Sequence, residues 1–267
     1  ALIPNERRKM NTQQTVLITG ASSGIGMELA REFAKHGHSV VLVARGVDKL
    51  EELARELRSK SNVRAEVIGA DLTEPSAPEK IVASLSERNL TIDVLVNNAG
   101  FGERGAFAQI DLQRQLDMIQ VNITAVAHLT RLLLPGMIQR NVGGILNVAS
   151  TAAFQGGPNM TMYYATKAFV LSFTEAIHEE VAGTNLHVTC LCPGPTHTGF
   201  VAAANMEGVN LFKMGAETAE AVAKVGYAAF AKNKAIAISG FKNKLAAFST
   251  RLAPRAVARK IAKMLNA

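Results

Sequence analysis

The chain alternates short apolar runs with longer segments of helical periodicity. The apolar runs have the length of strands and are nearly continuous in hydrophobicity, as expected for strands buried on both faces of a sheet. They are TVLIT (15–19), SVVLVA (39–44), RAEVIGA (64–70), IDVLVN (92–97), GILNVAS (144–150), HVTCLC (187–192) and AIAIS (235–239). The pattern predicts an α/β fold: a doubly wound parallel sheet of about seven strands with helices on both faces.

Amphipathic segments fill the spaces between these runs. Residues 26–37 carry Leu29 and Phe33 one helical turn apart and end at Gly37, and residues 48–60 repeat the pattern. Doubly wound sheets bind ligands at the carboxyl ends of their strands. Candidate functional residues are therefore expected where the apolar runs end.

The length of 267 residues suits one large α/β domain. We interpret residues 1–14 as a polar lead-in, 15–240 as a single Rossmann-like domain and 241–267 as a helical extension. The longest irregular segment, 193–215, is a candidate substrate loop, because long loops in compact domains often bind ligands. A surface excursion with a short helix is the alternative interpretation of that loop.

The positive charge belongs to the C-terminal extension. Lys and Arg exceed Asp and Glu by 29 to 22, and residues 241–267 hold seven basic residues and no acid. Within 254–265, two helical stripes predict an amphipathic basic helix, one of Val257, Ile261 and Leu265 and one of Arg255, Arg259 and Lys263. Such a helix packs on its own domain or on a partner subunit with a solvated basic face, or it contacts a membrane surface.

Several function classes are not expected from the composition. The extension is poor in aromatic residues for base stacking, so no nucleic-acid partner is predicted. The chain has no run of 18 uninterrupted apolar residues, which argues against a membrane span. Cys190 and Cys192 lie in an apolar run without further ligands nearby, so we predict no metal site and a reducing, cytoplasmic location.

A glycine-rich turn follows the first apolar run, in TVLITGASSGIGMELA (15–30). Gly20 would form the tight turn, Gly24 would let a pyrophosphate approach the backbone, and Gly26 would let the next helix pack on the strand. The start of that helix offers free N–H groups and a positive dipole end to phosphate. The strand, glycines and helix in this order predict a dinucleotide site.

The glycine spacing is G-x-x-x-G-x-G, and further segments follow it in a fixed order. They are NNAG (97–100), MIQVN (118–122), NVAS (147–150), YYATK (163–167) and CPGPTHT (192–198). Together they resemble the motifs of the short-chain dehydrogenase/reductase family over roughly residues 15–240. Intervening segments are most similar to the steroid-dehydrogenase-like bacterial members of that family.

This resemblance implies a hydride-transferring oxidoreductase with four catalytic residues. Tyr163 would donate a proton to the carbonyl oxygen during reduction, and Ser150 would hold that oxygen by a hydrogen bond. Lys167 would bind the nicotinamide ribose, and Asn122 would hold a water that links Lys167 to solvent. Taken singly, Ser150 could instead cap a turn, and Asn122 could be a satisfied buried amide.

Helical geometry distinguishes the two adjacent tyrosines. If residues 161–183 form a helix, Tyr163 has Lys167 four residues on and on the same face, whereas Tyr164 has Ala168 there. Moving a phenol pKa from ~10 to about 7 takes roughly 4 kcal/mol, and one cation at about 5 Å supplies roughly 3 kcal/mol. Tyr163 is thus the predicted proton donor, with a second stabilising contribution required, and Tyr164 is predicted to pack.

The end of the second strand predicts the cofactor. NAD-specific sites usually carry Asp or Glu there, but this strand ends at Ala44 and is followed by Arg45, whose guanidinium suits a 2′-phosphate. Asp48 is the counter-argument, although it is expected to lie in the next helix. The prediction is therefore NADP(H) over NAD(H). The full cofactor set is Gly20, Ser22, Ser23, Gly24, Ile25, Gly26, Arg45, Asp71, Leu72, Asn98, Ala99, Gly100, Tyr163, Lys167, Pro193, Gly194, Thr196 and Thr198.

The predicted substrate is a hydrophobic molecule with a carbonyl or secondary alcohol group. Apolar and Met-rich segments surround the catalytic residues, which suits substrates of variable shape. The candidate substrate contacts are Ser150, Phe154, Gln155, Met160, Phe200 and Met206. Half of the apolar candidates could instead belong to the core.

Two further expectations concern assembly and the rival function. Helices at 111–140 and 161–183 are widely apolar, and in the family they pair across a two-fold axis, which predicts a homodimer or homotetramer. The alternative function is a non-catalytic regulator that binds dinucleotide and senses redox state. Such proteins usually lose the catalytic residues, whereas all four are present here, which favours an enzyme.

Overall fold

The computed structural model describes residues 13–199 and 215–266, so predicted residues Phe200 and Met206 lie outside the described parts. All seven predicted strands form one parallel sheet in the order β3-β2-β1-β4-β5-β6-β9. The strands are β1 (Thr15–Thr19), β2 (Ser39–Ala44), β3 (Ala65–Gly69), β4 (Val94–Asn97), β5 (Gly144–Val148), β6 (His187–Cys192) and β9 (Ile236–Ile238). The fold prediction is confirmed.

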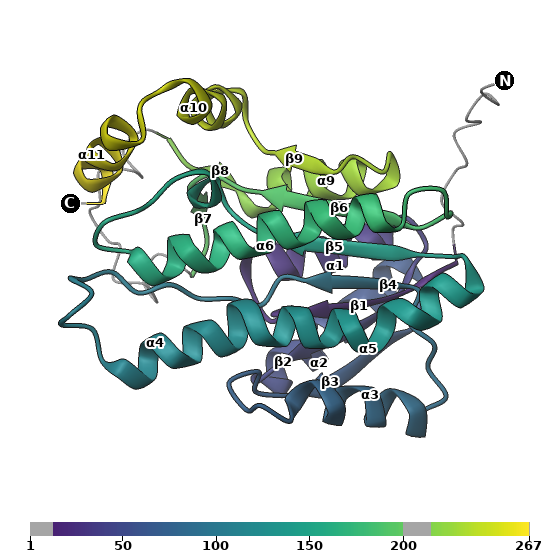
Figure 1. Ribbon diagram of the computed structural model, residues 1–267. Coiled ribbons are helices and arrows are strands. Elements are labelled where there is room, and N and C mark those ends of the chain that lie inside the picture. Colours follow the sequence, from purple (N-terminus) through teal and green to yellow (C-terminus); the bar gives the residue numbers. More distant parts are fainter. Residues whose placement is uncertain (1–12, 200–214, 267) are drawn as a thin grey trace, which may run out of the picture.

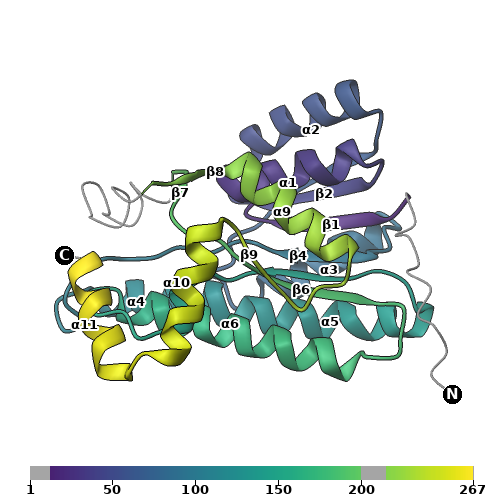
Figure 2. The same cartoon turned by 90° about the horizontal axis from the view of Figure 1, so that it is seen from above.

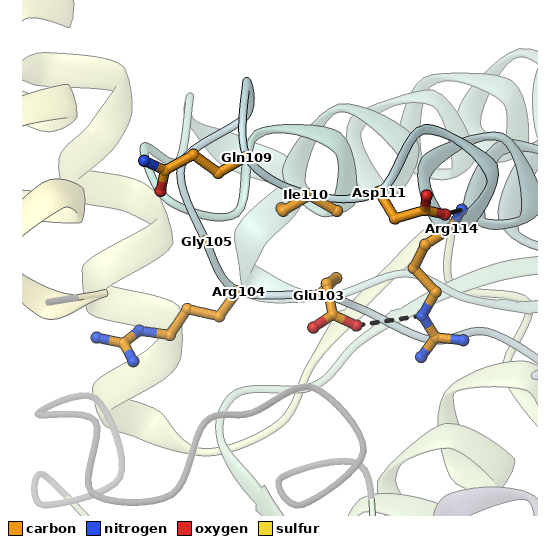
Figure 3. Close-up of a pocket in the computed structure, with 7 residues that line it drawn as sticks. All are labelled: Glu103, Arg104, Gly105, Gln109, Ile110, Asp111 and Arg114. Carbon is orange, nitrogen blue, oxygen red and sulfur yellow. Dashed lines mark hydrogen bonds and ion pairs between the residues drawn. The ribbon is translucent and has the colours of Figure 1, made fainter.

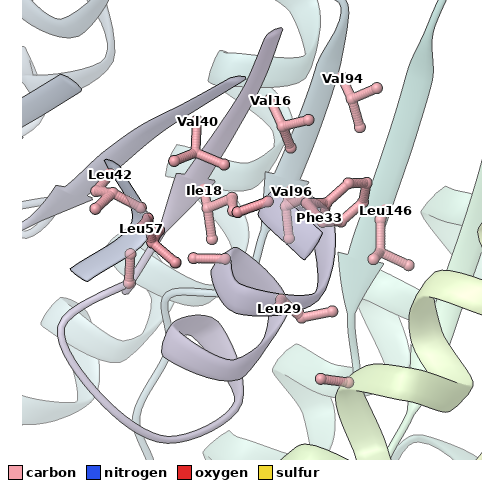
Figure 4. Close-up of a cluster of buried hydrophobic side chains, with 14 of the residues drawn as sticks. Val16, Ile18, Leu29, Phe33, Val40, Leu42, Leu57, Val94, Val96 and Leu146 are labelled. Carbon is pink, nitrogen blue, oxygen red and sulfur yellow. The ribbon is translucent and has the colours of Figure 1, made fainter. Parts of the chain in front are cut away.

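Helices cover both faces of the sheet (Figures 1 and 2). One layer consists of α1 (Gly24–Lys35), α2 (Val47–Ser61) and α9 (Ala219–Ala231). The other consists of α3 (Ala77–Glu87), α4 (Leu112–Ile119), α5 (Ala125–Arg140) and α6 (Thr161–Glu180). Figure 4 shows the core of the first layer, where Leu29 and Phe33 of α1 lie among strand residues such as Ile18 and Leu146. The predicted spacing of these two helical residues therefore marks the buried face of α1.

A π-helical turn interrupts the predicted helix 111–140. The turn η1 (Gln120–Thr124) joins α4 to α5 without a break in the helical path. The combined segment Leu112–Arg140 is long and apolar enough to cross a membrane. Here it packs on one face of the sheet, with Leu129 and Met137 of α5 fully buried in the core.

Short elements follow the carboxyl ends of the strands. The 3-10 helix η2 (Thr151–Phe154) follows β5, and the pair β7 (Thr196–His197) and β8 (Glu217–Thr218) flanks the outer part of the predicted substrate loop. Parallel pairing places these ends along one edge of the sheet. That edge is where the candidate site forms.

The basic C-terminal extension folds into two helices, α10 (Phe241–Leu252) and α11 (Arg255–Leu265), at one end of the molecule (Figure 2). The predicted helix over 254–265 is present as α11. Its buried contacts are Ala258 and Ala262, while Val257 and Ile261 of the predicted apolar stripe are 46% and 49% exposed and Leu265 lines a cavity. Small alanine side chains let the helix approach the domain closely, and this rotates the larger residues outward.

Candidate active site

Three predicted catalytic side chains meet at the carboxyl end of β5. Ser150 lies at the start of η2, and its Oγ accepts a hydrogen bond from the Ala152 backbone N–H at 3.1 Å. The Ser150 side chain also hydrogen-bonds Tyr163, which lies on α6 together with Lys167. The turn-capping alternative for Ser150 is thus part of its geometry, because the cap fixes the hydroxyl that faces Tyr163.

The adjacent tyrosines have different surroundings. Tyr163 lines the main cavity, and Lys167 Nζ lies 5.8 Å from the centre of its ring. The Tyr164 hydroxyl donates a hydrogen bond to Asn266 Oδ1 at 3.2 Å, and its ring covers Gly157 so closely that a Cβ there would clash at 2.3 Å. Both tyrosines line the cavity, but the Tyr163 hydroxyl is the one beside Ser150, whereas the Tyr164 hydroxyl joins α6 to the C-terminal end of α11.

Burial controls the protonation of both Tyr163 and Lys167. It raises the pKa of Tyr163 to about 12, and the Ser150 hydrogen bond counteracts this only in part. Burial also lowers the pKa of Lys167 to about 8, while its Nζ donates to the Val148 carbonyl oxygen at 2.8 Å. At neutral pH the phenol is neutral and the amine is charged, which is the state a proton donor for reduction requires.

Asn122 lies in the π-helical turn η1 and is almost fully buried. Its Nδ2 donates to the Phe101 carbonyl oxygen and to Thr166 Oγ1, and its Oδ1 accepts from the Phe101 backbone N–H. A Cβ added at Gly100 would lie 3.0 Å from Asn122 Oδ1 and 3.4 Å from Lys167 Nζ. The amide is thus satisfied and buried, and it stands beside the lysine behind the cavity wall.

One cavity of about 1380 Å³ connects the catalytic residues with the glycine turn. Every residue of the predicted cofactor set lines it except Gly26. A Cβ on Gly26 would lie 2.4 Å from the Gly20 carbonyl oxygen, so this glycine allows α1 to pack on the turn, as its predicted role requires. Gly20 and Gly24 adopt positive φ angles of 66° and 55°, which favour glycine.

Asn98 ties two of the predicted cofactor segments together. Its Nδ2 donates to the carbonyl oxygens of Thr19 and Gly20, and its backbone N–H donates to Thr19 Oγ1. The Ala99 backbone N–H donates to the same hydroxyl at 3.0 Å. The NNAG segment therefore fixes the shape of the glycine turn as well as lining the cavity.

Charged side chains surround the cavity at the end of β2. Arg45 is 76% exposed and makes only a long ion pair with Asp71, at 3.9 Å. Asp48 lies in α2 as predicted, but it also lines the cavity, as does Lys49, which the sequence reasoning did not select. Its position in the first turn of the helix that follows Arg45 could have indicated that Lys49 lies near the predicted cofactor phosphate. Two cations and two carboxylates therefore surround this end.

Only some of the predicted substrate contacts line the cavity at the end where the catalytic residues lie. Ser150, Gln155 and Met160 line the cavity. Phe154 does not; it packs on the small buried cluster around Val170 and Cys192, so its predicted substrate contact is corrected to a core contact. The wall that the sequence reasoning missed comes from α10 and α11, through Phe241, Ala246, Ala247, Thr250 and Leu265.

A second, smaller hollow lies between the loop at residues 103–111 and the start of α4 (Figure 3). Glu103 and Arg114 pair across it at 3.1 Å, and Arg104 turns away to donate to the Asn266 carbonyl oxygen. Since its main charges are already paired, this hollow serves the structure of the loop. Within residues 13–199 and 215–266, no cluster of three or more His, Cys, Asp or Glu suitable for a metal is present.

Comparison with known proteins identifies the family. The model of the short chain dehydrogenase family matches residues 14–208, which is most of the chain. The chain belongs to the short-chain dehydrogenase family. It is therefore an oxidoreductase with a Rossmann-type dinucleotide site, and the family prediction made from the motifs is confirmed.

Relatives within the short-chain dehydrogenases include ketoacyl reductases. The chain is 36% identical to a putative ketoacyl reductase of Streptomyces coelicolor over 77% of this chain and 79% of that protein. It is 38% identical to the very-long-chain 3-oxoacyl-CoA reductase of Bos taurus over 66% of this chain, and spans 57% of the bovine protein. A short-chain dehydrogenase from Sphingobium yanoikuyae, solved in complex with NADPH, superimposes with a TM-score of 0.80 at 32% identity, over 90% of this chain and 93% of that one.

Behind its site, this short-chain dehydrogenase carries a buried polar chain that the sequence reasoning missed. Asn97 Nδ2 donates to Asn147 Oδ1 at 2.9 Å, and Asn147 Nδ2 donates to Thr174 Oγ1 at 2.9 Å. Asn97 also donates to Thr130 Oγ1 on α5. Asn97 and Asn147 stand in register on β4 and β5. An asparagine near the end of each of these two apolar runs could have indicated this contact in the sequence. These hydrogen bonds attach α5, through Thr130, and α6, through Thr174, to the sheet.

Proposed function

We propose that this chain transfers hydride between NADP(H) and a ketone or secondary alcohol in a hydrophobic molecule. The observation that carries the proposal is the single cavity. One end holds Ser150, Tyr163 and Lys167, and the other end holds the glycine turn and Arg45. The reaction and the dinucleotide site thus share one connected space.

The residues present fit a dinucleotide phosphate. Ser23 precedes α1 without capping it by a side-chain hydrogen bond, so the first N–H groups of the helix remain for an anion. Gly24 lines the cavity next to them, and a Cβ there would lie 3.1 Å from the Thr198 side chain, so glycine lets Thr198 approach the turn closely. Arg45 and Lys49 supply positive charge for a 2′-phosphate at the end of β2, where no carboxylate ends the strand.

Each catalytic side chain then has a defined task. Bound nicotinamide dinucleotide supplies or accepts the hydride. Ser150 orients the carbonyl oxygen by a hydrogen bond, and the neutral Tyr163 hydroxyl donates its proton to that oxygen as charge develops on it. The Lys167 ammonium stabilises the phenolate that remains. Asn122 holds the backbone around Phe101 on one side of Lys167, and the Val148 carbonyl oxygen accepts from its ammonium.

The comparisons favour a keto group on an acyl chain as the substrate. Two of the relatives are named for ketoacyl and 3-oxoacyl reduction. In this chain, Met160, Ala247 and Leu265 give the substrate end apolar walls that accept a hydrocarbon chain. We therefore place 3-oxoacyl thioesters first, and other ketones flanked by apolar groups second.

The test is a turnover screen with both cofactors. Purified protein is mixed with NADPH or NADH and with 3-oxoacyl thioesters of increasing chain length, bulky ketones and small polar ketones, and loss of reduced-cofactor absorbance is followed. NADPH oxidation that grows with the apolar character of the ketone supports the proposal. Tight dinucleotide binding without turnover on any ketone or alcohol would favour the redox-sensing regulator instead.

Assembly belongs to the same proposal. Leu116 on α4 and Leu132 and Ile138 on α5 are 47%, 38% and 44% exposed, whereas Leu129 and Met137 of α5 are fully buried. On α6, Phe169 and Phe173 stack at 5.4 Å with their rings partly exposed. These faces suit a two-fold homodimer or homotetramer of a cytoplasmic enzyme. Light scattering at micromolar concentration checks the oligomer.

A further inference from the structure

The two C-terminal helices expose most of their large apolar side chains. We define the C-terminal surface as residues 241–265, which comprise α10 and α11. Of the fourteen large hydrophobic residues that are exposed in the described chain, seven lie on this surface: Phe241, Leu245, Phe248, Leu252, Val257, Ile261 and Met264. Their exposed fractions range from 46% to 81%. An accumulation of this kind marks an interaction site.

These apolar residues form regular stripes. On α10 they follow one another at intervals of four, three and four residues, and on α11 at intervals of four and three. Such spacing places each set on one face of its helix. The two helices are connected only by Ala253 and Pro254 and lie together at one end of the molecule (Figure 2). The C-terminal surface is thus a pair of amphipathic helices.

The stripes are not needed to hold the helices on the domain. Ala247, Ala258 and Ala262 are the buried apolar contacts of α10 and α11. Asn266 is fully buried and bonded to Tyr164 and Pro158. Smaller residues are therefore the buried docking contacts, whereas Leu245, Phe248 and Leu252 expose more than half of their surface.

The charges of the surface are all of one sign. Its seven basic residues are all exposed: Lys242, Lys244, Arg251, Arg255, Arg259, Lys260 and Lys263. None of them takes part in an ion pair within the described parts of the chain. A second copy docking face to face through this surface would place seven positive charges against seven others without an acid between them. Self-association through it is therefore opposed by charge.

We propose that the C-terminal surface docks on an anionic lipid membrane. Exposed Phe and Leu side chains enter the boundary between headgroups and acyl chains, while Lys and Arg side chains pair with lipid phosphates. Both features are needed for this proposal. The apolar stripes account for insertion into the lipid, and the basic residues account for the preference for a negatively charged surface. The inference rests on this surface and is independent of the substrate proposed above.

Docking in this way would bring the active-site cavity to the lipid surface. Ala246, Ala247 and Thr250 of α10 and Leu265 of α11 line that cavity, and Phe241 of the exposed stripe borders it as well. The helices therefore separate the cavity from the membrane by about the width of one helix. An apolar substrate dissolved in the lipid would have a short path to Tyr163.

The test is co-sedimentation of the full chain with lipid vesicles. One vesicle type contains phosphatidylcholine alone, and the other contains equimolar phosphatidylcholine and phosphatidylglycerol. At about 0.01 M salt, where charges act over about 30 Å, we expect the protein to pellet with the anionic vesicles only. At about 1 M salt the bound fraction should fall several-fold, but not to zero, because the apolar contacts remain.

Two double variants separate the contributions, and both leave the cavity lining unchanged. Leu245→Ser with Phe248→Ser should remove the salt-resistant binding, and Lys260→Glu with Lys263→Glu should remove the preference for anionic lipid. Matched controls, Val142→Ser and Lys80→Glu, change exposed residues elsewhere and should bind like the wild type. Turnover of a water-soluble ketone should be the same in all variants, which shows that each one folds.

Three results would overturn the proposal. The first is equal sedimentation, or none, of the wild type with the two vesicle types at low salt. The second is that the control substitutions weaken binding as much as the C-terminal ones. The third is an oligomer, seen by light scattering without lipid, that dissociates in the Leu245→Ser and Phe248→Ser variant, which would assign the surface to a second copy.

Discussion

The catalytic centre and the C-terminal helices share one cavity, but different forces hold them. At the catalytic centre, Asn122 and Lys167 are buried and their polar atoms bond to backbone or side-chain partners. At the C-terminal helices, the buried apolar contacts are alanines, large apolar side chains face outward, and the polar contacts gather at Asn243 and Asn266. The catalytic geometry is thus held by buried polar side chains within the sheet layers, whereas the substrate wall is held mainly near the two ends of the extension.

The adjacent tyrosines stand at the boundary between these regions. Tyr163 belongs to the catalytic centre through Ser150, and Tyr164 belongs to the C-terminal helices through Asn266. Their rings meet edge to face at 6.3 Å. Substitutions on either side of this boundary should therefore produce different kinds of effect.

The largest effect is expected from removing the Tyr163 hydroxyl. Tyr163→Phe should lower kcat by about 10²–10⁴-fold, because general acid catalysis of the carbonyl is lost. Dinucleotide binding should remain near the wild-type value, since the glycine turn is untouched. Steady-state kinetics with titration of the cofactor by fluorescence measures both quantities.

Tyr164→Phe is the matched control for that variant. It removes a hydroxyl from the neighbouring residue of the same helix, but this hydroxyl bonds Asn266 and not Ser150. Its kcat should stay within a few-fold of the wild type. Loss of turnover in Tyr164→Phe with retention in Tyr163→Phe would reverse the assignment of the two residues.

The next effect separates activity from stability. Burial lowers the pKa of Lys167 from 10.5 to about 8. While the buried amine is charged, the free energy of unfolding is therefore lower by about 3 kcal/mol. Lys167→Met should lower turnover about 10²-fold by removing the charge beside Tyr163. At pH 7 it should raise the free energy of unfolding by about 2 kcal/mol, after about 1 kcal/mol for the lost bond to Val148.

The pH dependence gives this prediction its sign. Below about pH 8 the amine is protonated in the folded and unfolded chains, so the wild type bears the full cost. As pH rises toward 10.5 the folded chain releases its proton first, and the advantage of Lys167→Met should vanish. Denaturant unfolding at several pH values measures it, with exposed Lys80→Met as the control. A variant that is less stable at pH 7 would show that the ammonium holds the site together.

The third effect lies at the opposite end of the cavity. Arg45→Ala should weaken NADPH binding by roughly 1.5–3 kcal/mol, which lowers kcat/KM with NADPH about 10–100-fold. The kcat/KM with NADH should change little, because NADH lacks the 2′-phosphate that accepts the charge-assisted bond. The long ion pair with Asp71 is worth little at this exposure and leaves Arg45 available. Equal losses with both cofactors would show that Arg45 supports the loop and does not bind phosphate.

The two regions also differ in how much of their structure could be predicted from the sequence. The strands and the glycine turn were predicted because apolar runs of strand length and glycines at fixed spacing report local requirements. Gly20 and Gly24 adopt positive φ, which restricts the residue type at those positions. Tyr163 was separated from Tyr164 by helical spacing alone, and in the structure both line the cavity but their hydroxyls have different partners, Ser150 for Tyr163 and Asn266 for Tyr164.

What the sequence did not show depends on packing between distant segments. Phe154 was placed in the substrate wall, but it packs on the buried cluster next to β6, because η2 turns it inward. The cavity contacts of Ala246 and Leu265 depend on how α10 and α11 dock, and that docking uses alanines, which carry no distinctive pattern. Contacts made through small residues leave little trace in hydrophobic periodicity.

The smallest effect tests the contact that joins the two regions. Asn266 Oδ1 accepts from the Tyr164 hydroxyl, and its Nδ2 donates to the Pro158 carbonyl oxygen at 3.0 Å. Asn266→Ala removes both bonds and should cost about 1–3 kcal/mol in the local stability of α11. Because Leu265 precedes it in the cavity wall, KM for an apolar ketone should rise a few-fold while kcat stays near the wild-type value. Amide hydrogen exchange should increase in residues 255–266 and remain unchanged in α6, with Tyr164→Phe giving about half the increase because it removes one bond of the two. A fall in kcat with unchanged exchange would mean that Asn266 acts on the catalytic centre directly, and the separation between the two regions would fail.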